Sequence, residues 1–310
     1  MFRLAHLSDP HVPPETAPLR RELVSKRALG WINWRRSRHR IHRRDVLDAL
    51  TGDLEHQSPD HIAVTGDLAI VSTASEWQSC RLWLQSLGPP DHVSLVPGNH
   101  DAYTRRAIPG TALAWREYMA GDPDTAAHSG FPYLRRRGPL AIIGCSSAVV
   151  SAPFMATGRI GRDQIARLKP LLRDLAHEGL FRVVLVHHTP IRTHGDRYRR
   201  MTDARAFRAL LGDCGAELVL HGHEHRASLH WIAGPRQPVP VVGVPSASAL
   251  EHGSKPGAQY NLYEVSGNAG AWTCRLRTRG FIGGELQELQ ETTLFENGQS
   301  TAPGGDFRAI

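Results

Sequence analysis

The sequence predicts an α/β protein in which two buried β-sheets are covered by helices. Six short apolar runs each end in a polar cluster, and each reads as a buried strand. These runs lie at 3–11, 61–68, 92–101, 140–147, 182–190 and 217–225. Segments with helical spacing of apolar residues separate several of them, at 46–54, 76–87, 165–175 and 203–211. Strands that alternate with helices favour sheets with polar sites at their carboxyl ends.

The helical signal fades after residue 225, and short strands with Gly/Pro turns follow at 230–232, 239–242, 260–265 and 272–276. We expect them to complete a second sheet of the same domain, which spans 1–282 and carries a basic insert at 20–44. The last stretch, 283–310, is rich in Gly, Glu, Gln, Thr and Ser. Few large apolar residues occur there, so we expect a C-terminal tail outside the core.

Composition restricts the class of protein. With 310 residues and 41% hydrophobic content the chain can bury a sizeable core. It contains no apolar run of about 18 residues, so we expect a cytoplasmic protein. The four cysteines are far apart and form no CxxC pair, which argues against a disulfide framework or a thiolate zinc site. A net charge of +7 fits a phosphorylated substrate, an anionic membrane or nucleic acid, and eighteen histidines point to metal chemistry.

Five polar clusters follow apolar runs, so a shared sheet would bring all of them to one edge. They are Asp9-Pro10-His11, Gly66-Asp67, Gly98-Asn99-His100-Asp101, His187-His188-Thr189-Pro190 and Gly222-His223-Glu224-His225. Carboxylate, imidazole and amide oxygen together form the ligand set of a first-row transition metal, or of a pair of them. Glycine lets the chain turn sharply and approach an ion closely. Each cluster alone is an ordinary turn or strand end, but the five in order predict a metal site.

In this order the clusters resemble the signature of the calcineurin-like metallophosphoesterases, namely D-x-H, GD, GNH[DE], H and GHxH. The resemblance covers about the first 265 residues. The elements TGDLA at 65–69, VPGNHD at 96–101 and HHxP at 187–190 further resemble the cyclic-nucleotide phosphodiesterase branch. The family fold implied is a two-sheet β-sandwich core flanked by helices, in four layers αββα.

The resemblance also implies a binuclear metal centre. The first metal is assigned to Asp9, His11, Asp67 and His225, and the second to Asp67, Asn99, His187 and His223. The Asp67 carboxylate bridges the two ions. His188 competes with His187, because both follow one strand and alternation directs only one toward the metals. Two imidazoles per ion favour Mn, Fe or Zn over Mg²⁺ or Ca²⁺.

The implied activity is hydrolysis of a phosphodiester or related phosphoester by a hydroxide that bridges the metals. His100 is expected to stabilise the phosphoryl oxygens or to protonate the leaving group. Asp101 is expected to fix the tautomer of the His100 ring through a hydrogen bond. A non-catalytic metal-binding scaffold is the opposing hypothesis, and the full ligand set with His100 disfavours it.

Residues 20–44 carry ten Arg or Lys against one Glu, with apolar residues such as Trp31 and Trp34 between them. One interpretation is a solvated basic helix that packs its tryptophans on the domain. Another is a cap beside the metals that grips a phosphorylated substrate or docks on an anionic membrane at the inner face. The second would suit a peripheral-membrane hydrolase of a lipid-linked diphosphate, such as a UDP-linked acyl sugar. Nucleic acid is a less favoured partner.

Overall fold

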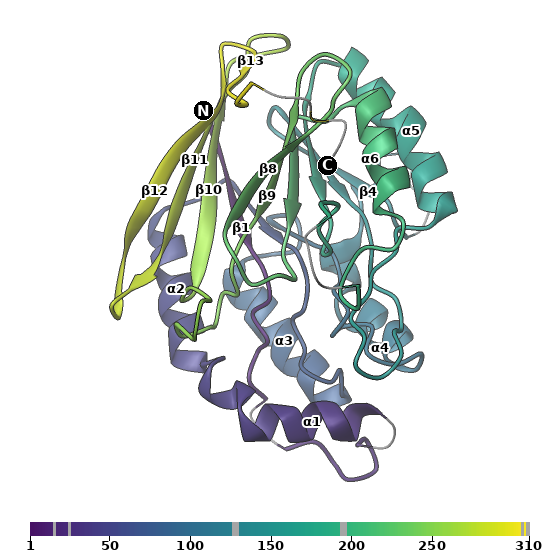
Figure 1. Ribbon diagram of the computed structural model, residues 1–310, viewed down its shortest axis with the longest axis vertical. Helices are drawn as coiled ribbons and strands as arrows, with labels where there is room; N and C mark the ends of the chain where they lie inside the picture. The colour runs from purple at the N-terminus through teal and green to yellow at the C-terminus, as the bar shows by residue number, and fades with distance from the viewer. Residues whose placement is uncertain (15–16, 24–25, 126–129, 193–196, 305–306, 308–310) are drawn as a thin grey trace.

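The computed structural model describes residues 1–310 except 15–16, 24–25, 126–129, 193–196, 305–306 and 308–310. Two mixed sheets form its centre (Figure 1). The first sheet runs in the order β13 (Gln299–Ser300), β12 (Glu285–Glu296), β11 (Thr273–Ile282), β10 (Gln259–Ser266), β1 (Phe2–Leu7), β2 (His61–Val64) and β3 (Val93–Leu95). The second runs in the order β4 (Tyr133–Arg137), β5 (Leu140–Gly144), β6 (Phe181–Leu185), β7 (Leu218–His221), β9 (Val239–Gly243) and β8 (Ser228–Ile232).

Parallel pairing gathers strand ends at one end of the sandwich. In the first sheet β1, β2 and β3 are parallel, with Leu7 opposite Val64 and Val64 opposite Leu95. In the second sheet β5, β6, β7 and β9 are parallel in turn. The carboxyl ends of β1, β2, β3, β6 and β7 are the points at which the five polar clusters begin.

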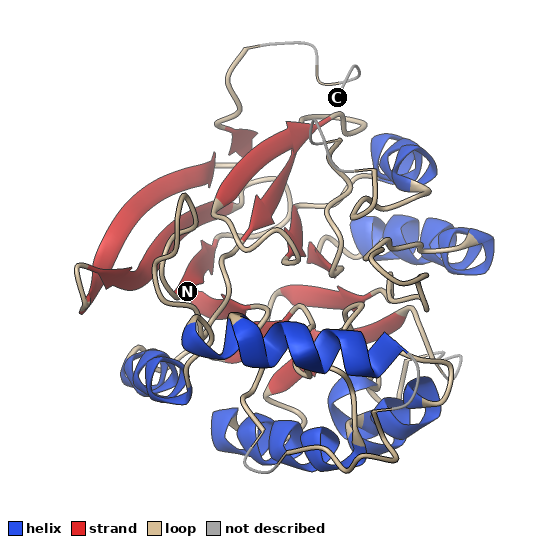
Figure 2. Ribbon diagram, turned by 60° about the horizontal axis from the view of Figure 1, so that its bottom comes forward, coloured by secondary structure: helices blue, strands red, loops and turns tan. Residues whose placement is uncertain are grey.

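Helices cover the outer face of each sheet (Figure 2). The helices α2 (Arg44–His56) and α3 (Ala74–Leu87) share one apolar cluster with the first sheet, and α5 (Arg162–His177) and α6 (Ala204–Cys214) share another with the second. A third cluster lies between the two sheets and includes Leu4, Val183 and Tyr263. These three apolar layers separate four structural layers, so the predicted αββα fold is confirmed.

Local sequence accounts for where these helices form. In α2 the buried residues Val46, Leu50 and Leu54 recur every four positions and make one apolar stripe. The helix α3 begins with a capping box, because the Thr73 side chain accepts from the backbone of Glu76 and the Glu76 carboxylate accepts from the Thr73 N–H. Among the described residues, no helix is both long enough and apolar enough to cross a bilayer.

The basic insert forms α1 (Lys26–Arg36) and a 3₁₀ turn, η1 (Arg38–Arg40). The helix α1 crosses the end of the sandwich at which the polar clusters begin (Figure 1). Trp34 is buried, and Trp31 packs with it against Ile70 and Val71. Both tryptophans therefore pack on the domain, as one interpretation expects, with Trp34 buried and Trp31 partly buried. Further along, α4 (Ala107–Ala114) and the 3₁₀ turn η2 (Arg116–Met119) follow the third polar cluster.

The expectation of a C-terminal tail is wrong for residues 285–296 and 299–300, which form β12 and β13. Strand β12 pairs with β11 from Ile282 opposite Glu285 to Cys274 opposite Phe295. The residues of β12 are exposed or partly buried, except Leu294 and Phe295 near its end, which are buried in the layer between the sheets. Backbone pairing and cross-strand ion pairs such as Arg277 with Glu288 hold a polar strand that hydrophobic patterning cannot reveal.

Candidate metal centre

The structure brings the five polar clusters together at the carboxyl ends of the parallel strands. Each predicted ligand lies within a few residues of a strand end, on β1, β2, β3, β6 or β7. All of these side chains are buried, with exposed fractions of 8% or less; they are Asp9, His11, Asp67, Asn99, His187, His223 and His225. Buried ionisable groups are costly unless they are paired or bind a metal, so this gathering calls for a function.

Five of these residues adopt a left-handed backbone conformation. The φ angles are 51° at Asp9, 38° at His11, 56° at Asp67, 70° at His223 and 53° at His225. Such a conformation costs a non-glycine residue about 1–3 kcal/mol, and it clusters at functional sites. Strain at five positions of one centre indicates that these turns are determined by the direction their side chains must take, and not by the preference of the backbone for a low-energy conformation.

Two glycines permit the close approach of backbone and carboxylate. A Cβ on Gly98 would lie 2.2 Å from Asp67 Oδ1, and one on Gly222 would lie 2.4 Å from Asp9 Oδ2. Both distances are far below van der Waals contact, so neither position accepts a side chain without movement of the carboxylate. The glycines of the third and fifth clusters therefore have the physical role predicted for them.

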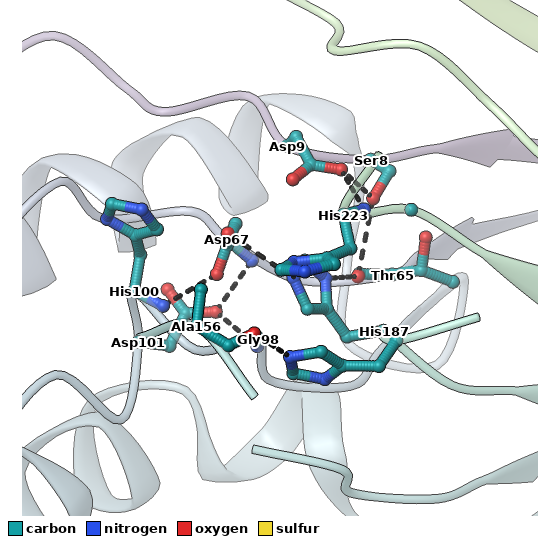
Figure 3. Close-up of polar contacts among 12 residues, drawn as sticks. Ser8, Asp9, Thr65, Asp67, Gly98, His100, Asp101, Ala156, His187 and His223 are labelled. Carbon is teal, nitrogen blue, oxygen red and sulfur yellow. Dashed lines mark hydrogen bonds and ion pairs between the residues drawn. The ribbon is translucent and has the colours of Figure 1, made fainter. Parts of the chain in front are cut away.

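At the first predicted metal position, Asp9, His11 and His225 converge. The Nε2 atom of His225 lies 3.1 Å from Asp9 Oδ1 and 3.3 Å from His11 Nε2. Asp9 Oδ2 is held by the Ser8 hydroxyl at 2.7 Å and by the His223 N–H at 2.9 Å (Figure 3). One ligand atom each of Asp9, His11 and Asp67 lies within 4.8 Å of the others.

At the second position, His187 Nε2 lies 3.3 Å from Asp67 Oδ2 and 3.3 Å from His223 Nδ1. The other Asp67 oxygen accepts a hydrogen bond from the His100 N–H at 2.7 Å (Figure 3). Asp67 thus contacts His187 at the second position, and it also lies close to Asp9 and His11 at the first. It lies between the two positions, where a bridging carboxylate is expected.

The choice between His187 and His188 follows from their ring nitrogens. His187 Nδ1 donates to Thr65 O at 2.6 Å, which leaves Nε2 directed at Asp67. His188 uses both nitrogens elsewhere, with Nδ1 2.8 Å from Ser147 Oγ and Nε2 3.2 Å from Ala156 O. A ligand needs one nitrogen with a free lone pair, so the geometry favours His187.

Two oxygen atoms test whether these residues fit metal ions. Among the described residues, the buried Asn99 Oδ1 accepts no hydrogen bond, and the buried Asp9 Oδ1 accepts none either and has only ion-pair contacts, the nearer with His225 Nε2. Most buried acceptors in proteins do have a hydrogen-bond partner, and a metal ion that binds the acceptor is one accepted reason for its lacking such a partner. The ring nitrogens of His11 and His223 that point away from the centre are held by Ala69 O and Arg199 O, as ligating histidines usually are. The oxygen and nitrogen donors fit transition-metal ions.

The predicted hydrogen bond from Asp101 to the His100 ring is wrong. Both Asp101 oxygens instead accept from backbone N–H groups, those of Asp67, Leu68, Ala69 and Gly98, at 2.8–3.0 Å. The His100 Nδ1 atom lies 2.5 Å from Ile70 O, which takes the orienting role. Asp101 therefore fixes the loop that carries Asp67, because a carboxylate that ends a tight turn satisfies the nearest free N–H groups first.

Comparison with known proteins identifies the family. Residues 2–227, well over half of the chain, match the calcineurin-like phosphoesterase family. The protein belongs to that family. It is also 25% identical over 182 residues to a probable cyclic nucleotide phosphodiesterase from a Synechococcus strain. That match spans 58% of this chain and 63% of the relative's length.

Two solved structures share the calcineurin-like phosphoesterase fold seen here. A dimetal phosphatase from Danio rerio has a TM-score of 0.59 at 10% identity, covering 96% of this chain and 99% of that one. A purple acid phosphatase from yellow lupin seeds has a TM-score of 0.59 at 11% identity, covering 94% of this chain and 53% of that one. At these identities the likeness concerns the fold alone.

Electrostatics in this phosphoesterase centre favour bound cations. Burial opposes ionisation of Asp9 and Asp67, but the neighbouring histidines, His225 for Asp9 and His187 for Asp67, hold the pKa of each carboxyl below its usual range. Burial lowers the pKa of His187, yet Asp67 outweighs it and raises that pKa to about 9. Burial lowers the pKa of His11 and of His223 well below the usual value, so both rings are neutral. His11 and His223 can thus bind metal as they stand, whereas His187 must release the proton that Asp67 stabilises on it when a cation binds.

Sequence reasoning missed two residues of the basic insert that reach this centre. Arg38 Nη1 lies 3.4 Å from His100 Nε2, and the ring of His42 lies 4.7 Å from that of His11. Neither follows a predicted strand or has an Asp, Asn or Gly beside it. The only available signal was the position of the insert, directly after Asp9 and His11.

Proposed function

We propose that this protein is a binuclear-metal phosphoesterase that hydrolyses a phosphodiester or a related phosphoester. The observation that carries the proposal is the pair of buried ligand groups joined at Asp67, with His100 beside them. Asp9, His11, Asp67 and His225 would hold one ion, and Asp67, Asn99, His187 and His223 the other. Mn, Fe or Zn suit this set of nitrogen and oxygen donors.

When bound, two such metal ions would lower the pKa of a coordinated water and offset the charge on the phosphoryl group. The chain supplies the remaining functions. Nδ1 of His100 donates to Ile70 O, so Nε2 is the nitrogen left for the substrate, and the imidazolium form of His100 would give its Nε2 proton to the leaving group. Asp101 holds the four backbone N–H groups that set the direction of the Asp67 carboxylate.

Positive charge beside His100 fits an anionic substrate. Arg38 approaches His100 Nε2 from the basic insert, and no ion pair to Arg38 occurs within the described ranges. Burial, together with the nearby charges of Arg199 and Arg38, lowers the pKa of Lys255 to about 8. We assign Arg38 to the phosphoryl oxygens, since a guanidinium matches them with paired N–H donors.

The relative from Synechococcus, a probable cyclic nucleotide phosphodiesterase, supports a diester as substrate. The test is to load the purified protein with Mn²⁺, Fe²⁺ or Zn²⁺ and to assay bis(p-nitrophenyl) phosphate, 3′,5′-cyclic nucleotides and phosphomonoesters. We expect diester turnover that a chelator abolishes and that added metal restores. Absence of turnover on every ester with every metal would favour the non-catalytic scaffold.

Exposed apolar residues favour a second candidate, a cytoplasmic hydrolase of a lipid-linked diphosphate at an anionic membrane face. On α1, Leu29 and Ile32 are exposed by 48% and 46%, among basic residues. Lys26 Nζ binds Ser151 O at 2.8 Å, and the same loop exposes Phe154 by 89%. Apolar side chains among cations suit the headgroup region.

The membrane candidate is tested by co-sedimentation with vesicles of phosphatidylglycerol and phosphatidylcholine. The double substitution of Leu29 and Ile32 by Ser should reduce binding, and added salt should reduce it further. Leu82 on α3 is exposed by 61%, so Leu82→Ser is the matched control and should bind as the wild type does. Equal sedimentation of all three proteins would reject this candidate and leave the soluble diester.

A further inference from the structure

The ring of His42 lies beside the first predicted metal position, although no predicted ligand comes from the basic insert. One nitrogen each of His11, His42 and His225 lies within 4.8 Å of the others. The His42 ring meets that of His11 edge-on at 4.7 Å and that of His225 edge-on at 5.5 Å. Only 4% of His42 is exposed. A third buried imidazole thus faces the same point as two predicted ligands.

Contacts with the loop at 248–250 and with Trp34 fix the position of His42. The backbone of 41–43 is bound to the loop at 248–250, with Arg43 N donating to Ser248 O at 2.8 Å and Leu250 N to Ile41 O at 2.8 Å. The indole of Trp34 stacks on the ring, with centroids 6.0 Å apart and planes 19° apart. The ring is therefore held rigidly, as a metal ligand must be.

The nitrogens of His42 are used as those of the predicted ligands are. Its Nδ1 lies 3.0 Å from Ser248 Oγ, and the nearby Ser246 hydroxyl donates to Asp9 O at 2.6 Å. Its Nε2 has no hydrogen bond within the part of the chain that the structure describes. Nδ1 is thus oriented by a hydroxyl on the loop that also braces Asp9, while the second nitrogen is left with a free lone pair.

His188 provides the contrast, because its ring lies 4.9 Å from that of His187 and 4.3 Å from that of His223, yet both of its nitrogens are bonded, to Ser147 and Ala156.

We infer that His42 is an additional ligand of the first metal ion. This inference rests on the proposed function, since it requires that the centre holds metal. The first position would then have three imidazoles, from His11, His42 and His225, with the Asp9 and Asp67 carboxylates. The second would have two imidazoles, with Asn99 and Asp67. The nitrogen-rich first position should bind its ion more tightly and should prefer Zn²⁺ over Mn²⁺ more strongly than the second does.

The test compares His42→Ala with the matched control His188→Ala, using Co²⁺ as a spectroscopic probe and Zn²⁺ in competition with a chelator. In His42→Ala the tighter Zn²⁺ dissociation constant should rise by about 10- to 100-fold, in the range found when metal sites lose supporting groups. The Co²⁺ absorption of the first-filled position should change as well. His188→Ala should keep both dissociation constants and the Co²⁺ spectrum of the wild type.

A gentler pair of variants covers the case in which His42→Ala does not fold, judged by thermal unfolding of the metal-free chain. His42→Gln keeps the bulk of the side chain and removes the imidazole, and Ser248→Ala removes only the partner of Nδ1. Both should weaken the tighter Zn²⁺ site, Ser248→Ala by less. Wild-type Zn²⁺ affinity and Co²⁺ spectrum in the folded variants would overturn the assignment of His42. A wild-type protein that binds neither ion would instead overturn the proposed function.

Discussion

The two histidine groups of the centre are alike in burial and differ in how their ring nitrogens are used. One group is His11, His42 and His225, and the other is His187, His188 and His223. In the first group His42 keeps one nitrogen without a hydrogen bond among the described residues, whereas in the second His188 has both nitrogens bonded. Proximity alone therefore does not identify a ligand. The partners of the far nitrogen, which direct the near one, separate a metal-binding histidine from a structural one.

The residue shared by both groups should give the largest effect. Asp67→Ala removes the one carboxylate that lies between the two positions, so we expect both ions to bind poorly and diester turnover to fall below detection. Elemental analysis after gel filtration measures the bound metal. Asp48→Ala, which alters an exposed carboxylate on α2, is the control and should keep wild-type metal content. Retention of two ions per chain by Asp67→Ala would remove the bridging role.

His100 should give the next largest effect, without loss of metal. His100→Ala should slow hydrolysis of a diester with a poor leaving group by about 10²- to 10⁴-fold, the usual contribution of a general acid. With p-nitrophenolate, which needs little protonation, the loss should be smaller. Rates for an alkyl and a p-nitrophenyl ester of the same phosphate provide the measurement. Equal losses on both would leave His100 only a charge-stabilising role.

Much of this centre could be predicted from sequence because its parts follow strand ends. Asp9 and Asp67 follow neighbouring parallel strands of the first sheet, and His187 follows a parallel strand of the second, which ends on the same side of the sandwich. His42 could not be predicted, since its position depends on Ser248, more than two hundred residues away. The role predicted for Asp101 was wrong for a related reason. Its adjacency to His100 in sequence does not reveal which backbone N–H groups a turn leaves without a hydrogen-bond partner.

The fold shows the same division. Strands with apolar runs were predicted, but β4 was missed because three of its five residues are arginine. Arg135 in that strand is buried and donates to the backbone oxygens of Pro90, Val93, Glu117 and Ala120. Hydrophobic patterning cannot detect a strand whose buried face includes a guanidinium that caps carbonyl groups from distant segments.

Arg38 should give an intermediate effect that distinguishes substrate contact from metal binding. Arg38→Gln should lower kcat/KM by about 10- to 100-fold, because a hydrogen bond to a charged group contributes about 1.5–3 kcal/mol and about 1.4 kcal/mol corresponds to a factor of ten. Metal content should not change. Arg40→Gln, in the same turn but exposed, is the matched control and should retain wild-type kcat/KM. Loss of metal in Arg38→Gln would place Arg38 among the supports of the centre instead.

The smallest effect on activity should come from His188, and it should appear as lost stability. His188→Ala leaves Ser147 Oγ and Ala156 O without their partner, and an unsatisfied buried group costs about 1–3 kcal/mol. The thermal midpoint should fall while two ions per chain remain. Calorimetry with parallel elemental analysis checks both points. Loss of one ion with an unchanged midpoint would reverse the roles given to His187 and His188.

The most direct test of the central claim, that this chain holds two metal ions joined at Asp67, is anomalous X-ray scattering from crystals grown with Mn²⁺. We predict two anomalous peaks that both contact the Asp67 carboxylate. One should lie among Asp9, His11 and His225, and the other among Asn99, His187 and His223. A single peak, or a pair of peaks of which only one contacts Asp67, would contradict the account.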